Sequence, residues 1–323
     1  MSHTHENRDD KVSLVEMGPR DGLQNEAATL SLAQRLALIA HLAESGLQRI
    51  EVGAFVSPKK VPQMADSAAL FNALPRRGPT RYGALVPNLQ GLQAAIAARA
   101  DEIGLFTACS DGFTRANIGI SVEESLVRFA PLVQEARSLG IKVRGYLSTV
   151  IACPFDGPTR PKRVAALAER LLDLGCHEIS LGDTIGVGTP GTVAPMLDAV
   201  LHEIPAGRLA VHFHDTYGQG LANLLPALER GIRTIDCSVA GLGGCPYAPG
   251  ASGNVASEEV VYLLHGLGMS TGVDLDQLAA TGQWVSELLG RPNGSRVGQA
   301  LHGRGRRLAQ EREQRPPGGH HAS

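Results

Sequence analysis

The sequence has little excess charge and few cysteines. It carries 30 Lys and Arg against 32 Asp and Glu, a formal net charge of −2, so no broad positive field is available to attract nucleic acid or an anionic membrane. The five cysteines are odd in number, widely spaced and without a CxxC pair, which argues against a disulfide framework and a thiolate zinc site. We therefore expect a cytoplasmic protein with no nucleic-acid or membrane partner.

Long apolar runs are also missing, since no stretch of about 18 uncharged apolar residues occurs in the chain. The N-terminal MSHTHENRDD is polar and acidic, unlike a secretory signal, and residues 1–11 are expected to be flexible. With 43% hydrophobic and 19% charged residues and 38 Gly, the composition excludes a disordered chain, a collagen and a small disulfide-rich domain. The length of 323 residues fits one large α/β domain.

Short β-rich runs alternate with longer stretches of helical periodicity from residue 12 to about 267, which is typical of parallel βα units. Eight strands are expected, in VSLVEMG, RIEVGAF, RYGALVP, EIGLFTA, KVRGYLSTV, EISLGDT, RLAVHFH and TIDCSVAGL. Eight such units are best closed into a (β/α)8 TIM barrel, because closure leaves no strand edge exposed. An open doubly wound sheet is the alternative, but the glycine-rich dinucleotide fingerprint is absent after the first strand.

The helices between these strands have recognisable boundaries. Ser31 and Gly46 bound one helix, and Ser121 with Glu124 predicts a capping box at the start of another. We expect the barrel to occupy residues 12–270, followed by a short C-terminal helical extension over 271–302. Residues 303–323 are rich in Arg, Gly and Pro with little apolar surface, so they are expected to form a disordered tail.

Unusual polar residues occur near the ends of several expected strands, which in a barrel lie on the face that carries the active site. His212 and His214 are two positions apart in a strand, so their side chains share a face. With Asp21 and Asn254 they form a mixed imidazole, carboxylate and amide set that suits Mg²⁺ or Mn²⁺. The alternative is a pair of interior histidines held by hydrogen bonds.

Three further residues near these strand ends are candidates for catalysis. Arg20 lies in a Gly-Pro-Arg-Asp-Gly turn, where its permanent charge can hold a developing oxyanion. Glu51 should point into the barrel, and Arg20 is its expected partner because a buried carboxylate needs one. Cys245 lies in the glycine-rich segment GLGGCPYAPGASGN, which is long enough to close as a lid. Cys153 has a weaker claim, and the remaining cysteines are expected to pack: Cys109, Cys176 and Cys237.

Six segments together carry a resemblance: VEMGPRDGLQNE, GAFVSPKKVPQMADS, LVPNLQG, EISLGDTIGVGTPGT, VHFHDTYGQGLAN and SVAGLGGCPYAPGASGNVASE. They resemble the 3-hydroxy-3-methylglutaryl-CoA lyase family over nearly the whole barrel, and SVAGLGGCPY is similar to its active-site signature. The RDG turn and the HxH strand are shared more widely, with isopropylmalate and homocitrate synthases among others.

The resemblance implies cleavage of 3-hydroxy-3-methylglutaryl-CoA to acetyl-CoA and acetoacetate, in leucine degradation and ketone-body formation, with one Mg²⁺ or Mn²⁺ per subunit. It assigns metal binding to four residues: Asp21, His212, His214 and Asn254. Arg20 and Gln24 would bind substrate, with Arg20 stabilising the enolate. Proton transfer would involve Cys245 and His212, while Glu51 and Asp183 match the family's supporting catalytic acids.

Other functions remain open at this point. They are a lyase for a bulkier 3-hydroxy-3-alkylglutaryl-CoA, a synthase condensing acetyl-CoA with a 2-oxo acid, a thiol hydrolase using Cys245, and a silent acyl-CoA-binding protein. The roughly 50 residues after the barrel are few for the regulatory domain of such synthases. Lys59, Lys60 or Arg115 could contact the phosphates of CoA. The family suggests a homodimer or larger homo-oligomer, and His302 stands where animal relatives carry a cysteine.

Overall fold

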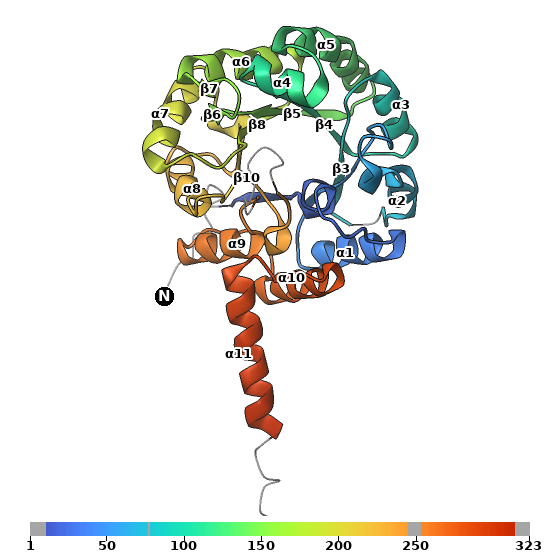
Figure 1. Cartoon of the computed structure of the whole chain (residues 1–323), viewed down its shortest axis with the longest axis vertical. Helices are drawn as coiled ribbons and strands as arrows, with labels where there is room; N and C mark the ends of the chain where they lie inside the picture. Colours follow the sequence, from blue (N-terminus) through green and yellow to red (C-terminus); the bar gives the residue numbers. More distant parts are fainter. Residues whose placement is uncertain (1–10, 77, 245–252, 314–323) are drawn as a thin grey trace, which may run out of the picture.

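Eight parallel strands close into a barrel in the computed structural model, which describes residues 11–76, 78–244 and 253–313 (Figure 1). They are β1 (Ser13–Glu16), β2 (Arg49–Ala54), β3 (Arg81–Leu85), β4 (Glu102–Ala108), β5 (Lys142–Ser148), β8 (Glu178–Asp183), β9 (Leu209–Phe213) and β10 (Thr234–Cys237). Each pairs with its neighbour in the sequence, and β1 pairs with β10 to close the ring. The expected barrel is confirmed, and each expected strand is present.

Helices surround this barrel on the outside (Figure 1). The α-helices up to the end of the barrel are α1 (Leu32–Glu44), α2 (Ser67–Ala73), α3 (Leu89–Ala97), α4 (Asp111–Ile118), α5 (Val122–Ser138), α6 (Pro161–Leu174), α7 (Pro190–Leu201), α8 (Gly220–Glu229) and α9 (Ser257–Gly266). Shorter elements are η2 (Gly18–Gly22), η3 (Pro62–Met64), η4 (Ala206–Arg208), η5 (Val239–Gly241) and the hairpin of β6 (Ala152–Cys153) with β7 (Gly157–Pro158).

Two of the helix starts were expected from the sequence. The Ser31 hydroxyl accepts a hydrogen bond from the backbone of Gln34, and the Ser121 hydroxyl accepts one from Glu124. In both cases the side chain at the third helical position accepts from the backbone of the Ser, which completes a capping box. Caps of this kind set where α1 and α5 begin, and thereby how long the preceding loops at the active face are.

The two faces of each strand have different chemistry. Outward-facing residues such as Val211 and Phe213 are buried among the apolar side chains of the helices. The interior instead holds charged groups, with the fully buried Arg144 donating to both Glu178 and Asp236. A buried guanidinium is tolerated because each of its polar edges has a carboxylate partner. The interior is therefore a rigid ionic scaffold beneath the mouth of the barrel.

The chain leaves the barrel through α10 (Leu275–Leu289), which packs against α1 and α9, and α11 (Arg296–Glu313), which projects outward (Figure 1). The prediction that a disordered tail begins at residue 303 is therefore wrong, since residues 303–313 are helical. The run RRLAQERE has high helix propensity, which outweighs Gly303 and Gly305. At the other end, Lys11 forms a β-bridge with Ser270, so it belongs to the folded domain. Residues 1–10 and 314–323 lie outside the described residues.

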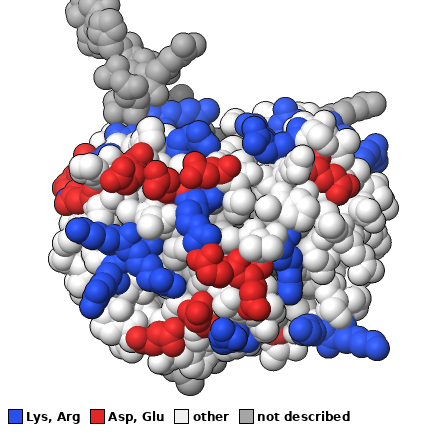
Figure 2. Space-filling model, turned by 90° about the horizontal axis from the view of Figure 1, so that it is seen from above, with Lys and Arg blue, Asp and Glu red and all other residues white. Residues whose placement is uncertain are grey.

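Among the helices of the described part, none combines the length and the apolar character needed to cross a bilayer. On the face of the molecule seen in Figure 2, Lys and Arg side chains are interspersed with Asp and Glu. That face therefore presents no continuous patch of one charge.

Candidate active site

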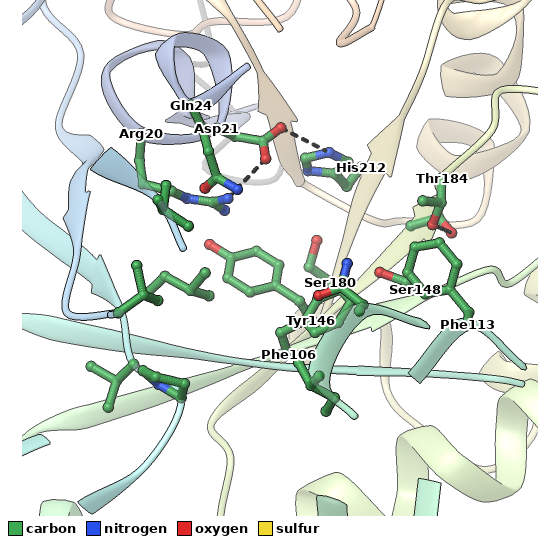
Figure 3. Close-up of a pocket in the computed structure, with 18 of the residues that line it drawn as sticks. Arg20, Asp21, Gln24, Phe106, Phe113, Tyr146, Ser148, Ser180, Thr184 and His212 are labelled. Atoms are coloured by element: carbon green, nitrogen blue, oxygen red, sulfur yellow. Dashed lines mark hydrogen bonds and ion pairs between the residues drawn. The ribbon is translucent and has the colours of Figure 1, made fainter. Parts of the chain in front are cut away.

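A cavity of about 500 Å³ opens at the carboxyl ends of the strands, within the range typical of small-molecule sites (Figure 3). Its lining comes from β3, β4, β5, β8 and β9, from η2 and the loops after β2 and β3, and from α4 and α5. Polar and charged lining residues include Arg20, Asp21, Gln24, Asn25, Lys60, Asn88, Asn117, Arg128, Tyr146, Ser148, Ser180, Thr184, His212 and His214. The sequence-predicted Arg20, Asp21, Gln24 and both histidines are thus brought together.

The GPRDG turn forms a short π-helix, η2, directly after β1. Its glycines permit close packing: a Cβ on Gly18 would clash with the Glu16 carboxylate, and one on Gly22 would clash with Leu242 and Ser238. The turn is therefore fixed against the segment that follows β10. This packing holds the side chains of Arg20 and Asp21 at the mouth of the barrel.

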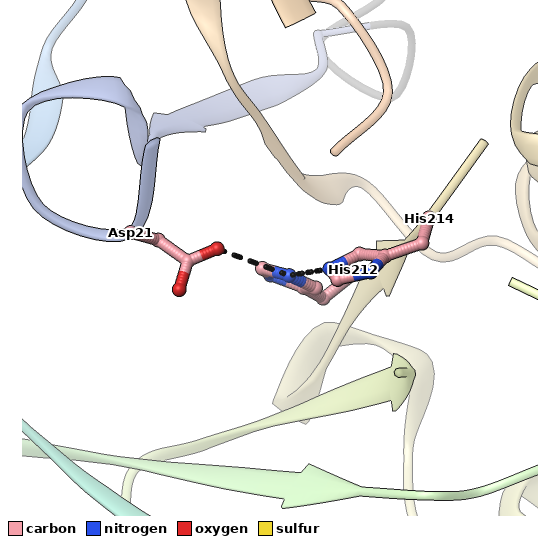
Figure 4. Close-up of side chains that lie close together, drawn as sticks. All are labelled: Asp21, His212 and His214. Carbon is pink, nitrogen blue, oxygen red and sulfur yellow. Dashed lines mark hydrogen bonds and ion pairs between the residues drawn. The ribbon is translucent and has the colours of Figure 1, made fainter. Parts of the chain in front are cut away.

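Asp21, His212 and His214 point toward one another across the mouth (Figure 4). One potential ligand atom from each lies within 4.8 Å of the other two. The Nε2 atoms of the histidines are 3.3 Å apart, and Nε2 of His212 is 4.0 Å from Oδ2 of Asp21. Asn254 joins the cluster by donating from Nδ2 to Oδ2 of Asp21 at 2.8 Å. Two imidazole nitrogens converging beside a carboxylate and an amide form a suitable donor set for a divalent cation.

The charge states of this cluster also suit a cation. Burial raises the pKa of Asp21, but Arg20, the histidines and the hydrogen bond from Asn254 outweigh it and hold this pKa at about 2. Burial and the neighbouring His212 lower the pKa of His214 to about 4. At neutral pH the pair therefore offers an ionised carboxylate and a neutral imidazole, which are the forms that bind metals.

Arg20 is held by carboxylates on both sides. It donates from Nε to Glu51 and from Nη1 to Asp21 Oδ1 at 2.8 Å, so the expected partnership with Glu51 is present. Glu51 also accepts a hydrogen bond from the Tyr146 hydroxyl. Burial opposes the charge on Arg20, yet the adjacent carboxylates raise its pKa further above its ordinary value. A fixed guanidinium thus faces the cavity with its charge retained at any working pH.

Asp183, expected among the catalytic acids, is not in the lining of the cavity. Ser180 and Gly182 of β8 line it, so the alternation along the strand turns Asp183 to the opposite face. Its Oδ2 accepts from the backbone of Gly188 at 2.7 Å. Burial raises the pKa of this carboxyl to about 6 despite backbone hydrogen bonds that lower it. The contacts show Asp183 fixing the loop between β8 and α7.

The four described cysteines are all buried. Cys245 lies outside the described residues. Cys153 is buried beside Phe113 and accepts a hydrogen bond from the backbone of Phe155, so it is not presented to the cavity. The three other thiols are buried, as expected for packing residues, and burial raises the pKa of each: Cys109, Cys176 and Cys237.

Several lining residues were not singled out from the sequence. Tyr146 and Ser148 are two positions apart in β5, Ser180 lies within β8, and Thr184 directly follows β8. Polar residues at every second position of otherwise apolar strands were the available signal. Lys60, one of three cations named from the sequence as a candidate contact to CoA, lines the cavity. Arg128 also lines it, whereas Lys59 and Arg115 do not.

The HMGL-like family model matches residues 11–285 of the chain. A 3-hydroxy-3-isohexenylglutaryl-CoA/hydroxy-methylglutaryl-CoA lyase from Pseudomonas aeruginosa is 52% identical over 291 residues, covering 90% of this chain and 97% of that protein. The crystal structure of hydroxymethylglutaryl-CoA lyase from P. aeruginosa has a TM-score of 0.89 at 52% identity and covers 91% of this chain and 98% of its own. An HMG-CoA lyase from Acinetobacter baumannii, solved with coenzyme A and 3-methylmalate, has a TM-score of 0.87 at 36% identity, with 91% and 96% covered.

Proposed function

Because this chain belongs to the HMGL-like family, we propose that it is a divalent-metal-dependent lyase that cleaves 3-hydroxy-3-methylglutaryl-CoA to acetyl-CoA and acetoacetate. The observation that carries the proposal is the convergence of Asp21, His212 and His214 beside the fixed charge of Arg20. The synthase and hydrolase alternatives are not favoured, since the relatives compared are lyases over nearly their whole length.

Asp21, His212, His214 and Asn254 would hold the cation, either Mg²⁺ or Mn²⁺. When bound, such an ion lowers the pKa of a coordinated hydroxyl and so favours loss of the proton from the tertiary alcohol of the substrate. The ionised Asp21 and the neutral His214 need no change of protonation state to act as ligands.

Arg20 would receive the negative charge that develops during bond breaking. When the bond between C2 and C3 of the substrate breaks, C3 becomes the ketone of acetoacetate and the electron pair passes to the thioester oxygen of acetyl-CoA. A guanidinium already oriented by Glu51 and Asp21 stabilises this oxyanion without reorganising. Gln24, which also lines the cavity, is proposed as a second polar contact to the substrate.

The enolate must then be protonated at carbon. We propose Cys245 as the group that delivers this proton, since Cys245 follows the lining residue Gly244 in the sequence. The part in this transfer that was expected of His212 is not proposed, because its Nε2 faces the metal cluster and its Nδ1 is bonded to Asp236. Closure of the glycine-rich segment around Cys245 would exclude water from the enolate. Glu51 acts through Arg20 in this scheme, while Asp183 acts only through the loop that it fixes.

The CoA moiety is proposed to extend from the cluster towards the rim. A relative with the same fold was solved with coenzyme A, which supports an acyl-CoA partner for this chain. Lys60 and Arg128 are cations in the cavity lining that are suited to its phosphates.

A role in leucine degradation and ketone-body formation, a cytoplasmic location and a homodimer are parts of the same proposal. The free thiols of the described cysteines are consistent with a reducing compartment.

The test is a discontinuous assay of acetyl-CoA and acetoacetate released from 3-hydroxy-3-methylglutaryl-CoA. We expect equal amounts of both products with Mg²⁺ or Mn²⁺ and a loss of turnover in EDTA that added metal restores. A 3-isohexenyl substrate in parallel decides whether the bulkier compound is preferred. Release of free CoA without acetoacetate, or full activity in EDTA, would contradict the proposal.

A further inference from the structure

The two ring nitrogens of His212 have different partners. Nε2 faces His214 and Asp21 in the metal cluster, while Nδ1 lies 3.2 Å from Oδ2 of Asp236. Asp236 is the residue of β10 that pairs with His212 of β9 in the barrel register. The two side chains are therefore neighbours on adjacent strands, both directed into the interior. Asp236 itself lies beneath the cluster and is not in the cavity lining.

Asp236 is built to remain an ionised acceptor. Arg144 donates to it from Nη2 at 2.6 Å and from Nη1 at 2.9 Å, and the Ser180 hydroxyl donates to Oδ2 at 2.7 Å. Asp236 is 1% exposed and Arg144 is fully buried. The charge of the guanidinium and the three donated hydrogen bonds favour the ionised form of this carboxyl group. A carboxylate in this state accepts hydrogen bonds and cannot donate one.

We propose that Asp236 is a positioning residue for the metal site. It accepts a hydrogen bond from Nδ1–H of His212, which keeps the proton on Nδ1 and leaves the lone pair of Nε2 directed at the cation. This inference rests on the proposed metal-dependent function. It follows from donor and acceptor chemistry: a hydrogen bond between an imidazole nitrogen and a carboxylate requires the proton on the nitrogen. A neutral imidazole with its proton on Nδ1 has its lone pair on Nε2.

With an amide in place of this carboxylate, the proton of His212 would no longer be restricted to Nδ1. An Asn side chain can turn its NH₂ group toward Nδ1, which would favour the proton on Nε2 and block the ligand position. Second-shell carboxylates of this kind change metal affinity by roughly 10- to 100-fold when removed. The competing interpretation is that Asp236 serves only to neutralise Arg144. In that case, removing another carboxylate that is bound to Arg144 should weaken metal binding by the same factor.

Glu178 provides a matched control that distinguishes these two interpretations of Asp236. It is also buried and also bound to Arg144, with its Oε2 accepting from Nε at 2.7 Å. It accepts hydrogen bonds from Arg49 and Arg144, and it lies four positions before Gly182, the residue of β8 that pairs with His212. Glu178→Gln therefore removes a negative charge from the same arginine without touching the histidine.

The experiment is titration of the metal-free full-length protein with Mn²⁺, following free Mn²⁺ by electron paramagnetic resonance. For Asp236→Asn we expect a Kd about 10- to 100-fold weaker than wild type, and for Glu178→Gln a Kd within about threefold. An unchanged Kd for Asp236→Asn, or an equal weakening in both variants, overturns the inference. If the wild-type protein binds no Mn²⁺ and does not cleave the thioester substrate, the proposed function itself fails.

A second measurement is made on the wild-type protein and does not depend on the folding of Asp236→Asn or Glu178→Gln. Wild-type metal-free protein labelled with ¹⁵N in histidine reports the tautomer of each ring, and His212→Asn identifies which signals belong to that residue. A proton on Nδ1 of His212 agrees with the inference. A predominant proton on Nε2 overturns it, whatever the affinity of the variants.

Discussion

At the scale of single residues, the site depends on side chains whose charges are fixed by their neighbours. Arg20 contacts Glu51 and Asp21, and its side chain is only 8% exposed. A guanidinium held in this way cannot reorient freely, so its position is set before substrate arrives. Preorganised charge of this kind contributes more in the transition state than in binding, because the oxyanion exists only as the bond breaks.

We predict that Arg20→Gln lowers kcat by about 10²- to 10³-fold while changing KM by less than about tenfold, the range seen when an oxyanion donor is removed. Steady-state kinetics on 3-hydroxy-3-methylglutaryl-CoA measure both constants. Arg170→Gln, at an exposed ion pair with Glu123, is the control and should leave both unchanged. A fall in kcat no larger than the rise in KM would show that Arg20 serves binding alone.

At the scale of elements, two buried acids fix the segment after β10, with Glu16 linking it to η2 and Glu258 linking it to α9. Glu16 accepts hydrogen bonds from the backbones of Gly18 and Val239, and Glu258 accepts one from Ala240. Ala240 has a left-handed conformation with φ of 55°, which costs energy for a residue with a Cβ. The hydrogen bond from its N–H to Glu258 stabilises this turn. The start of the segment that leads to Gly244 is therefore held in place by these hydrogen bonds.

This arrangement predicts a pH dependence of stability. Burial raises the pKa of Glu258 to about 8, so the folded protein binds its proton more tightly than the unfolded chain does. The resulting stabilisation is fully present below the unfolded pKa of about 4.5 and is lost as the pH rises through about 8. We expect the free energy of urea unfolding to fall between about pH 5 and pH 8, and to fall less in Glu258→Gln.

A glutamine mimics the protonated acid, since Ala240 needs only one acceptor oxygen. Part of the pH dependence should remain in the variant, because burial also raises the pKa of Glu16, to about 7. Glu44→Gln, at an exposed position on α1, controls for the loss of one carboxylate and should behave as wild type. Equal losses of stability in wild type and Glu258→Gln over this pH range would refute the assignment.

At the scale of the whole molecule, the ligand set exists only in the folded barrel. Asp21 and Asn254 are joined by a hydrogen bond although they are 233 positions apart, and the histidines come from β9 and the residue after it. The unfolded chain does not bring these groups together, so a cation that binds them favours the folded state by mass action.

We expect Mn²⁺ at about 100 times its Kd to stabilise the protein by about 2.7 kcal/mol relative to EDTA. For a chain of this size that is a rise in Tm of several degrees, measurable by calorimetry or circular dichroism. His214→Gln should abolish the rise. Identical transitions of wild type in Mn²⁺ and in EDTA would argue against a metal site at these residues.

Much of this protein follows from its sequence alone. The alternation of β-rich runs and helical periods located the strands, and the two-residue period placed His212 and His214 on one face, because neighbouring side chains in a strand point in opposite directions. Only the tertiary structure decided contacts between segments. The barrel register places Asp236 beside His212, and the packing of α5 brings Arg128 to the cavity. Local patterns determine which residues share a face, whereas register and closure determine what that face meets.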